Sequence, residues 1–267
     1  MIETNNLKIT GITPVIAPAE LREAFPLSPA AAAFVNASRE QIKAILHRRD
    51  RRVMAVVGPC SIHDPDAALD YARRLAALAR QVNDQLLLVM RVYFEKPRTT
   101  IGWKGLINDP DMDGSPQIPH GLGIARSLLL KITELQVPVA NEMLDPITPE
   151  YVADLISWGA IGARTTESQP HREMSSGLSF PVGFKNGTDG NLQIALDALK
   201  AAQHPHSFLG INRDGRTSII QTAGNPDVHI VLRGSARKPN YSPEDIAHTE
   251  ECLKKHALAP AIMVDCS

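Results

Sequence analysis

The stretch Val53-Met-Ala-Val-Val57, followed by Pro65–Val82 and by Leu86-Leu-Leu-Val-Met-Arg-Val92, decides the fold class. The first and third segments are short, apolar and rich in Val and Leu, and in the segment between them apolar residues recur with the period of a helix. A strand, a helix and a second strand in this order form the repeating unit of a parallel sheet wound with helices. The sequence therefore predicts an α/β protein.

The same alternation continues along the rest of the chain. Further strands are predicted at Val137–Ala140, Ala160–Gly162, Pro181–Phe184, His229–Leu232 and Ala261–Val264, and helices at Gly121–Gln136, Pro149–Trp158, His171–Gly177, Asp189–Ala202 and Pro243–Lys255. Segments 207–211 and 217–222 flank Asp214-Gly215, a strong hairpin turn signal, which predicts a β-hairpin inserted between the fifth and sixth barrel strands. We therefore predict a (β/α)8 barrel at 53–267, preceded by an N-terminal extension at 1–52.

The N-terminal extension differs in composition from the barrel. Four prolines punctuate its first half, and a helix is predicted at Pro29–His47. This helix leads into the basic run His47-Arg-Arg-Asp-Arg-Arg52. A ligand site is one interpretation of such a run, but we favour a solvated helix end before the first strand.

Charge and cysteine usage exclude several classes of protein. The 28 Lys and Arg residues against 29 Asp and Glu residues give a net charge of −1, so no global basic field exists that could bind nucleic acid. The three cysteines lack the spacing of a zinc finger, the polar N-terminus is no signal peptide, and no apolar run is long enough to span a membrane. We therefore expect a cytoplasmic protein with reduced thiols and no membrane partner.

The residues that directly follow the predicted strands carry the main functional signal. Ligands of parallel α/β barrels bind at the carboxyl ends of the strands. In this chain the residues at these positions are Cys60, Arg91, Glu142, Arg164, Lys185, Arg233 and Asp265. Four of these seven are basic, and converging Arg and Lys side chains indicate an anionic substrate. The alternative is that single members form ion pairs with Glu95, Glu142, Glu167 or Asp189.

Two further segments carry polar groups that could bind a ligand or have a structural role. The loop Arg91–Thr100 adds two more cations and two hydroxyl groups, enough for a second phosphate. Cys60 could be a metal ligand, a nucleophile or a small buried residue, and taken alone the last interpretation is favoured. For His63 we favour capping or a buried hydrogen bond.

Four long motifs resemble those of the type I 3-deoxy-D-arabino-heptulosonate-7-phosphate (DAHP) synthases. They are Gly58-Pro-Cys-Ser-Ile-His-Asp64, Arg91-Val-Tyr-Phe-Glu-Lys-Pro-Arg-Thr-Thr100, Gly162-Ala-Arg-Thr-Thr-Glu-Ser168 and Pro181-Val-Gly-Phe-Lys-Asn-Gly-Thr188. The resemblance covers nearly the whole chain and leans weakly toward the tyrosine-sensitive branch. It implies condensation of phosphoenolpyruvate with erythrose 4-phosphate to DAHP and phosphate, which opens the shikimate pathway to the aromatic amino acids.

The resemblance also implies roles for individual residues. Arg91, Arg164, Lys185 and Arg233 would bind phosphoenolpyruvate, with Lys96 at the reacting centre, Glu142 near the phosphate, and Arg98 and Thr99 on erythrose 4-phosphate. Cys60 would bind a divalent metal, which could be Mn, Fe, Co or Zn. The metal would polarise the aldehyde as a Lewis acid. A homo-oligomer and feedback inhibition by an aromatic amino acid, both involving the N-terminal extension, are implied as well.

The chain departs from the family pattern at its C-terminus. The family's other metal ligands, a His, a Glu and an Asp, and the last strand and helices of the barrel have no counterpart up to Ser267. We therefore expect a fragment of a longer protein, with an open apolar seam between the first and seventh strands and no turnover by this chain alone. Two alternatives are a non-catalytic, amino-acid-sensing partner subunit and a related 3-deoxy-octulosonate 8-phosphate synthase.

Overall fold

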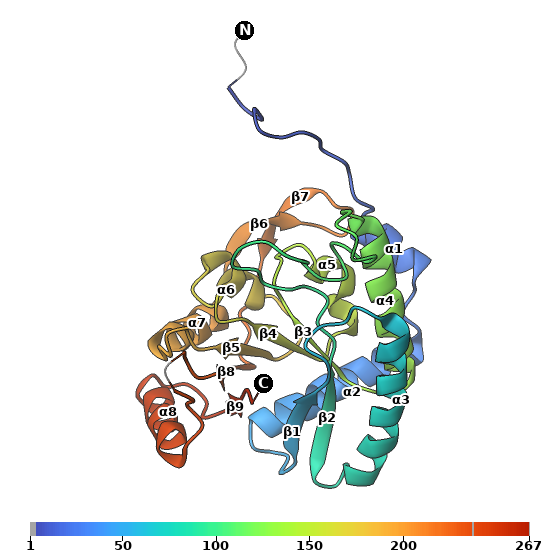
Figure 1. Ribbon diagram of the computed structural model, residues 1–267. Helices are drawn as coiled ribbons and strands as arrows, with labels where there is room; N and C mark the ends of the chain where they lie inside the picture. The colour runs from blue at the N-terminus through green and yellow to red at the C-terminus, as the bar shows by residue number, and fades with distance from the viewer. Residues whose placement is uncertain (1–3, 237, 267) are drawn as a thin grey trace.

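Seven parallel strands form the centre of the molecule. The computed structural model describes residues 4–236 and 238–266. Its main sheet contains β1 (Val53–Val57), β2 (Leu86–Arg91), β3 (Val139–Glu142), β4 (Trp158–Ile161), β5 (Val182–Lys185), β8 (Val228–Leu232) and β9 (Ile262–Val264). The strands lie in chain order and every neighbouring pair is parallel, so all carboxyl ends meet at one edge of the sheet (Figure 1).

The predicted hairpin and the predicted open seam are both confirmed. Strands β6 (Ser207–Ile211) and β7 (Thr217–Gln221) pair antiparallel between β5 and β8. Within the described ranges, β1 pairs only with β2 and β9 only with β8. A cavity of about 530 Å³ lies between these two edge strands, lined largely by apolar residues such as Met54, Val56 and Met263. The sheet is therefore a barrel that does not close over the described residues.

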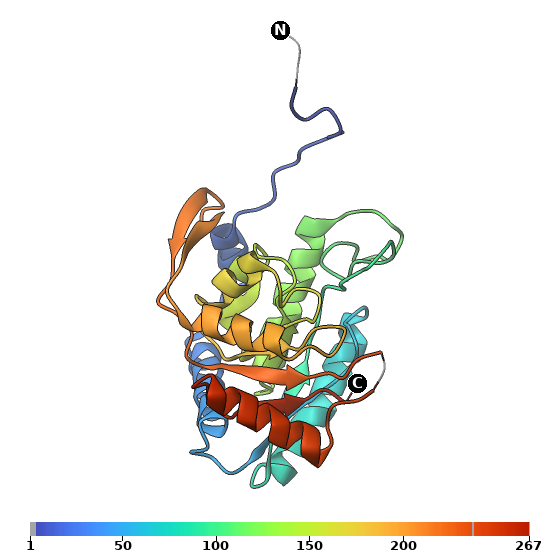
Figure 2. The same cartoon turned by 90° about the vertical axis from the view of Figure 1, so that its left-hand side faces the viewer.

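Helices cover the outside of the sheet (Figures 1 and 2). They are α1 (Pro18–Ala24), α2 (Pro29–Leu46), α3 (Pro65–Val82), α4 (Ile118–Glu134), α5 (Pro149–Val152), the 3-10 helix η1 (Ala153–Leu155), α6 (Gln169–Ser175), α7 (Gln193–Gln203) and α8 (Pro243–Lys255). Side chains of Ser28, Asp64 and Ser242 accept backbone N–H groups at the starts of α2, α3 and α8, each of which has a proline in its first turn. These are ordinary N-terminal helix signals. No helix in the described ranges is long and apolar enough to cross a membrane.

One helix was missed, and several sequence-based boundaries were wrong. Helix α4 begins three residues before the predicted Gly121, α7 begins four residues after the predicted Asp189, and β4 begins two residues before the predicted Ala160. Helix α1 was missed because its proline was interpreted as a break, whereas proline also suits the first turn of a helix. Strand β3 lies at Val139–Glu142, two residues later than predicted. The helix predicted to reach Trp158 ends at Leu155, because the Ser157 N–H donates to the Val139 carbonyl and starts the ladder of β4.

Helix α2 packs against the amino ends of the strands. Its Ile42 is fully buried in a cluster with Leu87, Trp158 and Val231. The basic run that follows α2 is held by intramolecular contacts, since His47 lies 2.8 Å from the Asp227 carboxylate and Arg52 pairs with Asp50. This agrees with the interpretation as a helix end. The division of the chain at residue 52 stays a prediction.

Candidate active site

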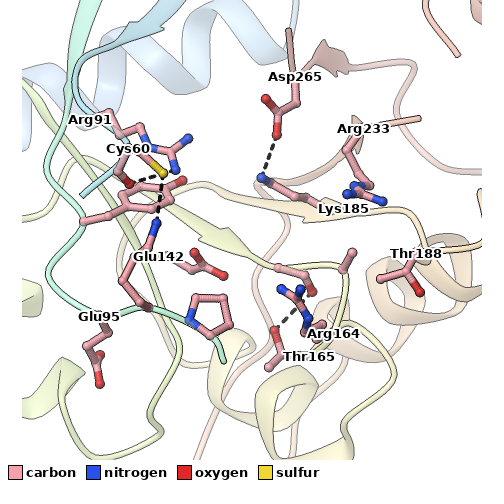
Figure 3. A pocket seen from close by; sticks show the side chains of 15 residues that line it. Cys60, Arg91, Glu95, Glu142, Arg164, Thr165, Lys185, Thr188, Arg233 and Asp265 are labelled. Atoms are coloured by element: carbon pink, nitrogen blue, oxygen red, sulfur yellow. Dashed lines mark hydrogen bonds and ion pairs between the residues drawn. The ribbon is translucent and has the colours of Figure 1, made fainter. Parts of the chain in front are cut away.

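The carboxyl ends of the strands surround one pocket of about 310 Å³ (Figure 3). Seven residues predicted from the sequence line it: Cys60, Arg91, Lys96, Glu142, Arg164, Lys185 and Arg233. Asp265, which follows β9 and is the last of the strand-end residues selected from the sequence, lines it too. The parallel arrangement brings these residues together although the chain places them up to 205 positions apart, from Cys60 to Asp265. The expected convergence of cations is therefore a feature of the structure.

Arg91 is fixed at the end of β2 by two contacts. Its Nη2 donates to the Cys60 carbonyl at 3.0 Å, and its guanidinium carbon lies 4.1 Å from the centre of the Tyr93 ring. Its Nε is buried and has no hydrogen-bond partner among the described residues. A guanidinium group that an aromatic face holds in one orientation at the pocket wall is suited to bind an oxyanion.

Cys60 and Lys96 form a close pair at the pocket wall. The Lys96 Nζ donates to the Cys60 Sγ at 2.9 Å. This hydrogen bond, opposed by burial and helped by the charges of Lys96 and Arg91, lowers the pKa of the Cys60 thiol. Metal binding and nucleophilic attack both require the thiolate, so the environment favours the reactive form.

The remaining three cations differ in their partners. Lys185 Nζ lies 2.6 Å from Asp265 Oδ2. Arg164 and Arg233 form no ion pair with any residue that the structure describes. The alternative that carboxylates neutralise each strand-end cation is therefore wrong for these two arginines, which remain available for a ligand.

Glu142 ends β3 inside the pocket and is buried. Burial raises the pKa of Glu142, while Lys185, Arg91, Lys96 and Arg164 act in the opposite direction. A Cβ atom at position 162 would collide with the Glu142 carboxylate, so glycine at this position allows the close approach of strand β4 to the acid.

Glu95 was not predicted as a site residue. It lines the pocket with only 8% of its surface exposed. Burial, followed by the negative charges of Asp145 and Glu142, raises the pKa of Glu95 to about 8. The signal that could have found it is an acid directly after the buried run Val92–Phe94. Thr165, Thr188 and Tyr93 were missed as well, since each lies beyond the strand-end position that the pattern selects.

Arg98 and Thr99 do not line this pocket. The Arg98 Nε donates to the Trp103 carbonyl at 2.7 Å, within the long loop between β2 and α4, and Thr99 is exposed. The structure therefore does not bring the predicted second phosphate site into the same cavity as the strand-end cations.

The donors near Cys60 do not make up a complete metal site in the described part of the chain. The structure contains no group of three or more His, Cys, Asp or Glu side chains there that could hold an ion. Cys60 with its lowered pKa fits the role of one soft ligand. Its sulfur is within hydrogen-bonding distance of an ammonium group and of no second candidate ligand that an ion would need. His63 does not line the pocket and is exposed.

Comparisons with known proteins agree on one family. The model of the DAHP synthetase I family matches residues 29–267. The phospho-2-dehydro-3-deoxyheptonate aldolases of Escherichia coli K12 named Tyr-sensitive, Phe-sensitive and Trp-sensitive are 57%, 55% and 52% identical to this chain. The alignments cover 98%, 99% and 100% of this chain and 74%, 75% and 76% of those proteins.

A solved structure agrees with the fold. The phospho-2-dehydro-3-deoxyheptonate aldolase of Francisella tularensis SCHU S4 superposes with a TM-score of 0.95 at 50% identity. The match covers 97% of this chain and 76% of that one. The seven parallel strands and the inserted hairpin are therefore the arrangement of this family.

Proposed function

Because this chain belongs to the DAHP synthetase I family, we propose that its strand-end pocket binds phosphoenolpyruvate for condensation with erythrose 4-phosphate. One observation carries the proposal. A chain of net charge −1 gathers Arg91, Arg164, Lys185 and Arg233 around about 310 Å³, and the three arginines have no ion-pair partner among the described residues. An anion bound between these side chains would relieve the repulsion between their like charges.

Each cation would contact a different part of the ligand. Phosphoenolpyruvate carries a phosphate and a carboxylate, and guanidinium groups bind both with two parallel hydrogen bonds. Arg164, Lys185 and Arg233 lie on the same side of the pocket, whereas Arg91 lies on the opposite side beside Cys60 (Figure 3). This separation favours one anionic group at each end of the ligand. The sequence-based role of Glu142 near the phosphate is compatible with its buried position between these groups.

The chemistry forms a carbon–carbon bond and a carbon–oxygen bond, and it breaks the bond between carbon 2 and the phosphate oxygen. Carbon 3 of phosphoenolpyruvate attacks the aldehyde carbon of the sugar phosphate, and the aldehyde oxygen takes up a proton. Water then adds at carbon 2 and releases a proton, and phosphate leaves with the remaining hydroxyl proton, so that carbon 2 becomes a ketone. Lys96, whose ammonium group already donates to Cys60, is the proposed proton donor. The family generally uses a divalent metal, which would polarise the aldehyde, and Cys60 is its proposed ligand in this chain.

We also propose a site for the second substrate and regulation by an effector. Arg98 and Thr99 would hold the sugar phosphate in the loop between β2 and α4, outside the main pocket. The relatives named Tyr-, Phe- and Trp-sensitive suggest regulation by an aromatic amino acid. Leu7, Ile12, Leu209 and Ile219 are strongly exposed apolar residues on the N-terminal segment and the hairpin, which supports a homo-oligomer formed there.

Calorimetric titration with phosphoenolpyruvate tests the site. We expect wild-type residues 1–267 to bind it, and Arg164→Ala to weaken the affinity at least tenfold because a charge-assisted contact is lost. Arg98→Ala should leave this affinity nearly unchanged. Equal affinity of the Arg164→Ala variant and the wild type would overturn the assignment, and so would an equal loss in both variants.

An activity assay tests the chemistry. We propose that residues 1–267 expressed alone release no phosphate from the two substrates, because Cys60 is a single thiolate and carbonyl-activating metal sites normally use three protein ligands. The measurement is phosphate release with manganese present and after chelation, beside the Escherichia coli Tyr-sensitive relative as positive control. Metal-stimulated turnover by residues 1–267 at the rate of the relative would contradict this proposal. The cytoplasmic location stays a prediction, which cell fractionation would test.

A further inference from the structure

Two fully buried polar side chains, Thr166 and Asn186, connect the strand ends that carry the pocket's cations. Neither lines the pocket. The Thr166 hydroxyl lies 2.9 Å from the Lys185 carbonyl and 3.0 Å from the Gly162 carbonyl, so its proton is shared between the two acceptors. It therefore links the segment that carries Arg164 to the end of β5.

Asn186 makes the next connection, from β5 to β8. Its Oδ1 accepts the Arg233 N–H at 2.9 Å, and its Nδ2 donates to the Gly234 carbonyl at 3.2 Å. Asn240 completes the contact, since it donates to the same Oδ1 and accepts the Gly234 N–H. The backbone on both sides of Arg233 is thus tied to the residue that follows Lys185.

These links act on backbone whose side chains repel one another. Arg164, Lys185 and Arg233 converge on one side of the pocket, and the two arginines have no ion-pair partner among the described residues (Figure 3). Without a ligand, repulsion between like charges favours a wider mouth. Buried hydrogen bonds resist that widening because a broken one leaves a buried polar group unsatisfied.

We propose that Thr166 and Asn186 are positioning residues that hold Arg164, Lys185 and Arg233 in the spacing of one bound phosphate before the ligand arrives. The inference rests on the proposed function of the pocket. Binding then spends little free energy on rearranging the protein, which is the general advantage of a preorganised site. The predicted consequence is loss of ligand affinity without an unusual loss of stability.

The chain offers a matched control for each residue. Thr133 is equally buried in α4, and its hydroxyl donates to the Leu129 carbonyl far from the pocket. Asn225 is buried before β8, at the opposite end of the sheet, where its Nδ2 donates to the Ser175 and Phe180 carbonyls and its Oδ1 accepts the Asp227 N–H. Substitutions at these two positions remove the same kinds of bond from the fold alone.

The experiment is calorimetric titration of residues 1–267 with phosphoenolpyruvate and, separately, with inorganic phosphate. We expect Thr166→Val and Asn186→Ala to weaken both affinities about tenfold or more. The controls Thr133→Val and Asn225→Ala should lower the melting temperature by similar amounts and leave the affinities within twofold of wild type. Thr166→Ser keeps the hydroxyl and should restore wild-type affinity.

The possible results separate the inference from the proposed function. If wild type binds neither ligand, the proposed function of the pocket is wrong. If wild type binds but the site variants lose no more affinity than the controls, the pocket stands and the positioning role is overturned. Should Asn186→Ala not fold, the comparison of Thr166→Val, Thr166→Ser and Thr133→Val decides the question alone.

Discussion

Burial keeps the Glu95 side chain in its acid form although it lines a pocket rich in cations. The charges that act on it are those of Asp145 and Glu142, and they add to the effect of burial. A neutral carboxyl group contributes no negative charge to an anion site at neutral pH. The raised pKa of about 8 therefore preserves the positive potential of the pocket over the physiological range.

Glu95→Gln should change how the affinity for phosphoenolpyruvate depends on pH above pH 7. In wild type, Glu95 ionises as the pH rises through about 8 and adds a negative charge to the pocket, so affinity for phosphoenolpyruvate should fall several-fold between pH 7 and pH 9. In the glutamine variant the side chain at position 95 stays neutral, so its affinity for phosphoenolpyruvate should fall much less over the same pH range. Calorimetry across this range measures the difference. Parallel curves for the two proteins would show that Glu95 does not titrate there.

His229 is a second buried titratable residue, on the interior of the sheet. It is 1% exposed, its ring nitrogens have no hydrogen-bond partner among the described residues, and the Trp158 ring lies 5.8 Å away. Burial lowers the pKa of His229 to about 4. Between about pH 6.5 and pH 4, His229 is therefore neutral in the folded protein and protonated in the unfolded chain.

This difference predicts acid destabilisation with a definite sign. As the pH falls from about 6.5 to about 4, only the unfolded chain binds the proton on His229, so the free energy of unfolding decreases, by about 3 kcal/mol in total. His229→Leu should flatten this part of the curve. The measurement is urea unfolding at pH 7 and pH 4.5, and an unchanged difference between the two pH values in the variant would exclude the histidine as its cause.

Among the elements, α4 and η1 are joined by one buried arginine. Arg126 is 1% exposed, and it forms two hydrogen bonds with the Asp154 carboxylate, at 2.8 and 2.9 Å. It also donates to the carbonyls of Phe25 and Tyr151. A single side chain therefore ties the segment after α1, helix α5 and η1 to the long helix α4.

Arg126→Met should lower the free energy of unfolding by about 3–5 kcal/mol, because the carboxylate of Asp154 and two carbonyls lose their partner. The control is Arg74→Met, which removes an exposed ion pair with Asp70 on α3 and should cost less than about 1 kcal/mol. Urea denaturation of both variants gives the comparison. Equal losses of the free energy of unfolding in the two variants would mean that burial does not determine how strongly the Arg126–Asp154 pair stabilises the fold.

The sequence predicted most elements because each carries its own local signal. Pro65–Val82 and Pro243–Lys255 were placed at the bounds that the structure shows, since a cap and a proline fix each start. The ends of β3 and of the helix before β4 depend instead on pairing with distant strands, and no local pattern reports that pairing. These two ends were therefore misplaced by two or three residues.

The candidate site shows the same division. Strand-end positions are visible in the sequence because an apolar run precedes them, so Arg91, Lys185 and Arg233 could be selected. Glu95 becomes a site residue only because the chain turns back after β2 and buries it, and Arg98 leaves the pocket because it binds the Trp103 carbonyl. The path of a long loop is not encoded in a periodic pattern.

At the scale of the whole molecule, the pocket and the fold compete for stability. The chain is nearly neutral, yet cations from four strand ends meet at one mouth. In the ligand-free protein this repulsion lowers the free energy of unfolding, and natural binding sites commonly reduce stability in this way. Within the described part of the chain, the open seam between β1 and β9 adds unpaired backbone groups at the two edges of the sheet.

An anion should therefore stabilise the protein, and the gain should depend on the pocket. At a phosphoenolpyruvate concentration of 100 times Kd, the free energy of unfolding should increase by about 2.7 kcal/mol. Arg233→Ala removes one repelling charge, so the ligand-free variant should melt at the wild-type temperature or slightly above it, while the gain from ligand at the same concentration should shrink.

Arg73→Ala, which replaces an exposed arginine on α3, serves as control and should keep the full gain. Thermal melts with and without ligand provide the data. A ligand-free Arg233→Ala variant that melts well below wild type would show that the arginine stabilises the fold, and the competition between site and stability would then be refuted.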